Sequence, residues 1–144
     1  MKNIITDILI LALLCFIWGN STVPVSDSAE LSDGVLSSFW EALGITGEIP
    51  EWMHTGIRKL AHFCEYALLG FLCALRFISH PEGKLVPVSL CVSAAIIDET
   101  VQLFADRGSR IYDVLLDSLG AAAGVLFAAI IFEIIKRNKS DDLS

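Results

Sequence analysis

The sequence has few basic residues and lacks the short motifs that hold nucleotides, structural metals or disulfides. It contains 10 Lys and Arg against 17 Asp and Glu, a formal net charge of −7. This balance argues against nucleic-acid binding, because phosphate contacts need clustered Lys and Arg. The four cysteines form no Cys-x-x-Cys pair, and no glycine-rich phosphate loop is present. We therefore expect no disulfide and no cofactor.

Charged residues are scarce overall, whereas apolar residues are abundant. Hydrophobic residues make up 54% of the chain and charged residues 19%, while soluble domains are nearer about 45–50% and about 25%. Four apolar segments approach the roughly 20 residues that cross a bilayer, at about 4–19, 57–78, 85–104 and 111–135. The sequence predicts an all-α polytopic membrane protein, a four-helix transmembrane bundle forming one domain over residues 1–144.

The distribution of Lys and Arg predicts how these spans are oriented. Six basic residues flank one side of the predicted spans and belong in the cytoplasm: Lys2, Arg76, Lys84, Lys136, Arg137 and Lys139. The segment 20–56 contains six acids and no Lys or Arg, so we expect it outside, with both termini cytoplasmic. No Ala-x-Ala cleavage site follows the first span, and we expect that span to be retained.

The acidic outer segment contains its own apolar pattern. Five residues repeat at helical spacing after a candidate cap at Ser32 or Asp33: Val35, Leu36, Phe39, Trp40 and Leu43. We predict a short amphipathic helix that lies on the outer leaflet or covers the bundle. A plain packing helix fits the same pattern equally well.

Ionisable residues stand inside or beside three predicted spans, although each costs about 2.5–3.5 kcal/mol at the bilayer centre. The second span enters from outside, the third exits outward and the fourth enters again, so their polar residues should meet at one depth. They are His62 and Glu65; Asp98, Glu99 and Gln102; and Asp113 and Asp117. Four bases fall on the same side, against the topology rule, and should have acidic partners: Arg58, Lys59, Arg107 and Arg110. If the charges only hold the helices together, Arg107 or Arg110 would pair with Asp113, Asp117 or Glu99.

Gly120 and Gly124 lie on the same stripe of the fourth span as the two aspartates. A Gly-x-x-x-Gly pattern lets two helices approach closely. The pair packs either within one chain or between two copies in a homo-oligomer.

Two blocks of the sequence resemble a known family. The segment from Arg58 to Tyr66, Arg-Lys-Leu-Ala-His-Phe-Cys-Glu-Tyr, resembles the first signature of the VanZ-like family. The segment from Asp98 to Phe104, followed by Arg107 and Asp113 and continued by Asp117 and Gly120, resembles the second. Ala105 and Asp106 depart from a Pro-Gly that is frequent in the family, which changes the turn and not the charge pattern.

The resemblance implies a polytopic protein of the bacterial cytoplasmic membrane that acts in the cell envelope. The namesake of the family is associated with resistance to the glycopeptide teicoplanin, so a contribution to antibiotic resistance is an expectation for this chain. Membrane lipids or lipid-linked cell-wall intermediates are the partners that this setting implies.

Three interpretations of the polar residues remain. We favour an outward-facing pocket that binds a lipid or lipid-linked anionic head group, because arginines clamp phosphate groups well. Its ligand-binding residues would be Arg58, Lys59, Asp98, Gln102, Arg107, Arg110, Asp113 and Asp117. The alternative is an enzyme acting on a lipid-linked envelope substrate, with acid–base chemistry from His62, Glu65 and Glu99. The third interpretation is that the charges only hold the helices together.

A metal site is a variant of the first two interpretations. His62, Glu65, Asp98 and Glu99 offer nitrogen and oxygen ligands for a divalent cation. The nearby Arg and Lys residues argue against it, because they can neutralise the acids directly. From the sequence alone we expect no metal.

Overall fold

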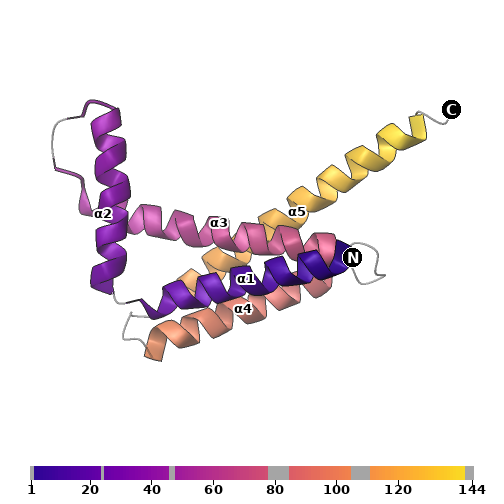
Figure 1. The fold of residues 1–144 in the computed structure, drawn as a ribbon, viewed down its shortest axis with the longest axis horizontal. Helices are drawn as coiled ribbons and strands as arrows, with labels where there is room; N and C mark the ends of the chain where they lie inside the picture. Colours follow the sequence, from indigo (N-terminus) through magenta and orange to yellow (C-terminus); the bar gives the residue numbers. More distant parts are fainter. Residues whose placement is uncertain (1, 24, 46–47, 78–84, 105–110, 142–144) are drawn as a thin grey trace.

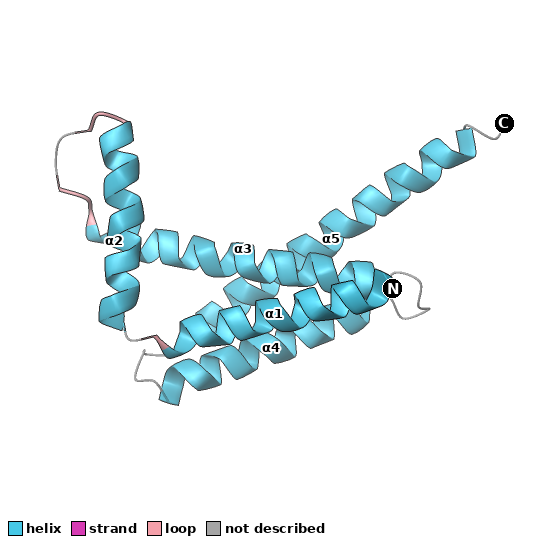
Figure 2. Ribbon diagram, in the orientation of Figure 1, coloured by secondary structure: helices cyan, strands magenta, loops and turns pink. Residues whose placement is uncertain are grey.

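The computed structural model describes residues 2–23, 25–45, 48–77, 85–104 and 111–141, and these residues form five helices. The helices are α1 (Lys2–Thr22), α2 (Val25–Ala42), α3 (Glu51–Phe77), α4 (Leu85–Phe104) and α5 (Ile111–Asp141). Figure 2 shows that helices joined by loops account for the described chain, without a strand. Four of them, α1, α3, α4 and α5, are long and apolar enough to cross a membrane. The predicted all-α, four-span fold is confirmed.

Three of the spanning helices extend beyond the segments predicted from hydropathy. Helix α1 continues to Thr22, α3 begins at Glu51 instead of 57, and α5 continues to Asp141. At the start of α3, the Pro50 carbonyl accepts a hydrogen bond from the Met53 amide at 2.9 Å, and Glu51 places an acid in the first turn. Both features favour a helix N-terminus. Hydropathy marks the part of a helix that fits the bilayer, whereas capping decides where the helix ends.

Helix α3 lies at the centre of the bundle and packs against α1, α4 and α5. The core is small, and most of its side chains are short: Ile17, Tyr66, Leu69, Cys73, Cys91, Ala94, Ala95 and Ala121. Large apolar side chains point outward along the spans, among them Leu11, Leu119 and Phe127. Such a surface suits contact with lipid, because lipid chains are as apolar as these side chains.

The closest helix contact is between α3 and α5, and glycines make it possible. A Cβ on Gly120 would lie 2.4 Å from the Phe63 carbonyl oxygen, and one on Gly124 would lie 1.8 Å from that of Ala67. In the opposite direction, a Cβ on Gly70 would lie 2.2 Å from the Ala121 carbonyl oxygen. The Gly-x-x-x-Gly pair therefore packs within one chain. A homo-oligomer would have to use another face.

Helix α2 crosses the end of the bundle where α1 and α4 end and α3 and α5 begin (Figure 1). Leu36 is buried, whereas Val35, Phe39 and Leu43 are exposed, so the helix has a packing side and a free apolar side. A close contact between His54 Nδ1 and Asp33 Oδ1, at 2.6 Å, connects α3 to α2. The predicted amphipathic helix is confirmed.

The start of α2 was predicted too late in the chain. The helix begins at Val25, and not after a cap at Ser32 or Asp33, because the intervening sequence includes good helix formers such as Ala29, Glu30 and Leu31. Its C-terminus is closed by Gly44 at φ 67°. The Ile45 amide donates to the Trp40 carbonyl and the Gly44 amide to that of Glu41, which is a Schellman motif.

The start of α1 and the end of α5 lie at the end of the bundle opposite α2 (Figure 1). The side of the membrane on which the termini lie stays a prediction. We use the term "α2 end" for the end of the bundle that α2 crosses.

Candidate functional site: a buried polar cluster at the α2 end

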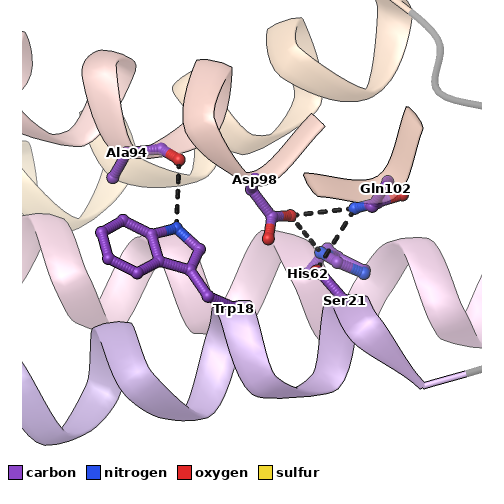
Figure 3. Close-up of polar contacts among 6 residues, drawn as sticks. All are labelled: Trp18, Ser21, His62, Ala94, Asp98 and Gln102. Carbon is purple, nitrogen blue, oxygen red and sulfur yellow. Dashed lines mark hydrogen bonds and ion pairs between the residues drawn. The ribbon is translucent and has the colours of Figure 1, made fainter. Parts of the chain in front are cut away.

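Three helices bring polar side chains together at the α2 end. Figure 3 shows His62 of α3 and Gln102 of α4 pointing toward the Asp98 carboxylate, with Ser21 of α1 beside them. His62 Nδ1 lies 3.9 Å from Asp98 Oδ2. The Gln102 amide nitrogen donates to Asp98 Oδ2 at 2.9 Å and approaches the Ser21 hydroxyl oxygen at 3.4 Å. The sequence prediction that spans two and three meet through these residues agrees with this geometry.

Asp117 of α5 completes the group. One ligand-type atom from each of His62, Asp98 and Asp117 lies within 4.8 Å of the others. Asp98 is 0% exposed and Asp117 is 1% exposed. Among the described residues, neither carboxylate oxygen of Asp117 has a hydrogen-bond partner, nor has Asp98 Oδ1. We call His62, Asp98 and Asp117, together with Gln102, the polar cluster.

Further acidic groups surround the polar cluster. The charges of Asp98, Glu99, Asp113 and Glu65 all act on Asp117, and all have the same sign. Glu99 is 5% exposed, and Glu65 is half-buried and accepts a hydrogen bond from the Asn20 side chain. The site is therefore a concentration of acidic groups within the spans, where low polarity makes it costly to ionise all of them together.

A basic rim lies beside the cluster at the start of α3. Lys59 Nζ bonds Asp113 Oδ1 at 2.6 Å, with side chains that are 41% and 28% exposed. Arg58 is half-buried. Lys59 was expected to have a partner, and the close α3–α5 contact brings it to Asp113. The pairing of Arg107 or Arg110 with Asp113, Asp117 or Glu99 stays a prediction. Arg107 and Arg110 lie outside the described residues.

A second ion pair, which is partly exposed, lies at the far end of the bundle. Arg76 Nε bonds Asp7 Oδ1 at 2.6 Å, which joins the end of α3 to the start of α1. This ion pair is separate from the polar cluster and provides a reference charge pair for experiments.

Sequence reasoning missed the contribution of α1. Ser21 is 0% exposed and contacts Gln102, and Asn20 bonds Glu65. The Trp18 indole nitrogen donates to the Ala94 carbonyl at 3.4 Å, which holds α1 against α4 (Figure 3). In the sequence, polar residues at the end of an apolar span look like residues at the membrane–water interface. Only the contacts of Asn20 and Ser21 in the folded structure show that they belong to the site.

Tyr66 is fully buried and packs in the apolar core next to the polar cluster. Tyr66 follows His62 by one helical turn, so helical spacing is the signal that places both on one face.

The fold and the site define a polytopic α-helical membrane protein with ionisable side chains buried inside its spans. The family model described as VanZ/LLP1 matches residues 7–132. The chain belongs to the VanZ/LLP1 family, which confirms the resemblance found in the two sequence signatures. No curated protein and no solved structure matches the chain.

Proposed function

We propose that this VanZ/LLP1 protein is a bacterial cell-envelope protein that binds the anionic head group of a lipid or lipid-linked molecule at the α2 end. The burial of Asp117, with no hydrogen bond to its carboxylate among the described residues, supports a functional site at the α2 end. The anionic character of the ligand is inferred from the basic side chains beside the site. An intramembrane ionisable residue that faces the bundle interior is by default a candidate for function.

A purely structural role accounts poorly for this arrangement. Interhelical polar contacts in membranes contribute about 0.6 kcal/mol on average, whereas an Asp at the helix centre costs about 2.5–3.5 kcal/mol. Lys59 and Asp113 form an ion pair of the expected stabilising kind. Asp117 receives no comparable compensation from the described side chains, and Asp98 receives it at Oδ2 alone.

The basic rim supports an anionic ligand. Arg58 and Lys59 stand one turn before His62 on α3. The sequence places Arg107 and Arg110 in the link between α4 and α5, close in the chain to Gln102 and Asp113. Guanidinium groups bind phosphate oxygens in a bidentate manner. The acidic outer segment and the position of α2 fit an outward-facing site, reached from the outer leaflet.

Lipid binding to the purified protein tests this proposal. The protein would be placed in nanodiscs of neutral lipid, and phosphatidylglycerol or a polyprenyl diphosphate would be titrated in separate arms. We expect Arg58→Ala and Arg107→Ala to weaken binding of at least one anionic lipid about tenfold, or about 1.4 kcal/mol.

Arg137→Ala serves as the matched control, since Arg137 is exposed on α5 at the far end of the bundle. It should bind like wild type. Equal loss in all three variants would indicate a non-specific charge effect, and no preference for anionic over neutral lipid would refute the proposal.

A second candidate is acid–base catalysis on a lipid-linked substrate. The His62 imidazole, 3.9 Å from the Asp98 carboxylate, favours it, because a carboxylate that orients a histidine is a common arrangement for proton transfer. The variant Glu99→Gln separates the two functions. If the protein is an enzyme, the variant should still bind the lipid but lose turnover. If the protein only binds the lipid, the variant should keep the effect that the wild type has in cells.

A further inference from the structure

We propose that His62, Asp98 and Asp117 form a binding site for one divalent metal ion of the zinc or manganese type. The three residues come from α3, α4 and α5, so the ion would join three spans at the α2 end. The proposal goes beyond head-group binding and does not depend on it.

The distances are close to those of a metal site. Ligand atoms about 2.1 Å from one ion lie about 3.4 Å apart in tetrahedral geometry. His62 Nδ1 and Asp98 Oδ2 are 3.9 Å apart, and the three ligand-type atoms all lie within 4.8 Å of one another. Side-chain torsions would therefore have to move the ligand atoms by roughly 1 Å to bring all three to bonding distance, without helix movement.

The carboxylate oxygens that lack a hydrogen bond indicate that the ligand would be a cation. Both oxygens of Asp117 and Oδ1 of Asp98 are buried and lack a hydrogen bond among the described residues. Two carboxylates and a neutral imidazole bring two negative charges, which a divalent ion balances. Buried charges are generally either paired or coordinated to metals.

Among the described residues, no Lys or Arg forms an ion pair with Asp98 or Asp117, so a bound cation could balance their charge. Lys59 bonds Asp113, and Arg76 bonds Asp7 at the far end. Gln102 donates to Asp98 Oδ2 and thereby fixes the carboxylate, as hydrogen-bonding neighbours of metal ligands generally do. The sequence suggested that Arg and Lys would neutralise the acids and so argue against a metal. In the structure, Lys59 and Arg76 pair with Asp113 and Asp7 and not with Asp98 or Asp117.

The types of ligand atom limit which metal ions the site would prefer. One imidazole nitrogen with two carboxylate oxygens suits zinc or manganese, whereas calcium and magnesium prefer oxygen ligands throughout. Three protein ligands leave a coordination position open for water or another small ligand. A phosphate oxygen entering past the basic rim would fit this position.

The first experiment measures metal content of the tag-free protein in detergent. The protein is stripped with a chelator, loaded separately with zinc or manganese, desalted and assayed by elemental mass spectrometry. We expect about one ion per chain in wild type and at least about tenfold weaker binding in Asp117→Asn and His62→Gln. Glu133→Gln, an exposed acid at the far end of α5, is the matched control and should bind like wild type.

Folding of the variants is checked by size-exclusion profile and helical circular dichroism. If the variants do not fold, cobalt absorption of the wild-type protein replaces them, since tetrahedral coordination gives strong visible bands and aqueous cobalt does not. Substoichiometric retention of both metals, equal retention by folded ligand variants, or absence of cobalt bands would each overturn the proposal.

The metal and head-group proposals can fail separately. Metal content is measured without added lipid, and lipid titration is run with and without chelator. Retention of one ion by a protein that shows no anionic-lipid preference would leave the metal site standing and refute only the proposed function.

Discussion

The contact between α3 and α5 predicts that Gly124→Ala destabilises the bundle. The added Cβ would lie 1.8 Å from the Ala67 carbonyl oxygen and 2.8 Å from the Phe71 nitrogen. These are backbone atoms, so no side chain can turn away. Since ordinary contact begins near 3.4 Å, the two helices would have to separate by roughly 1.6 Å, which is overpacking of the most severe kind.

The magnitude follows from two opposing effects. Overpacking costs about 1–3 kcal/mol, and this backbone clash belongs at the upper end. Alanine returns about 0.5–1 kcal/mol relative to glycine in a helix. The net loss is about 2 kcal/mol, or a fall in melting temperature of roughly 4–8 °C for a chain of this size.

Gly56→Ala is the matched control, because Gly56 also lies in α3 and a Cβ there meets nothing within 4 Å. It should keep only the propensity gain and raise the melting temperature by about 1–4 °C. Thermal unfolding in detergent, followed by circular dichroism, compares the two variants with wild type. Equal stability of Gly124→Ala and Gly56→Ala would refute the close α3–α5 packing.

Three further predictions concern charge, topology and phenotype. Lys59→Ala and Asp113→Ala should show a coupling of about 0.6 kcal/mol in a double-mutant cycle of thermal stability, as membrane pairs do on average; additive effects would count against the ion pair. Cysteine introduced at Ser38, in a background without native cysteines, should react with an impermeant thiol reagent in intact cells; protection of that site would reverse the predicted orientation. Expression in a sensitive Gram-positive host should raise tolerance of teicoplanin more than of vancomycin, and Arg107→Ala at matched membrane levels should abolish this effect; unchanged susceptibility of the wild type would separate this chain from the resistance phenotype.

The fold was predictable because lipid imposes a simple rule on sequence. A spanning helix must satisfy its backbone hydrogen bonds internally and be apolar over the bilayer, so four long apolar segments indicate four spans. Helix ends were less predictable. Residues such as Glu51 and Thr22 are polar enough to leave the bilayer yet remain helical, since hydropathy does not report capping.

The candidate site was predictable in its parts and not in its pairing. Charged residues in spans are costly, so His62, Asp98 and Asp117 stood out from the sequence, and alternating span directions placed them at one end. The sequence left the pairing open, because it offered Arg107 or Arg110 for Asp113, Asp117 or Glu99 and named no partner for Lys59. The structure pairs Lys59 with Asp113, 54 residues away.

The sequence by itself determined that this chain is a membrane protein of four spans with ionisable residues at one end, because hydropathy and charge are properties of residues. The tertiary structure decided which of those residues meet. The α3–α5 glycine contact sets the relative position of Lys59 and Asp113, and the approach of α4 brings Asp98 to within 3.9 Å of His62. Distances between residues far apart in the chain depend on helix packing, which no local pattern specifies.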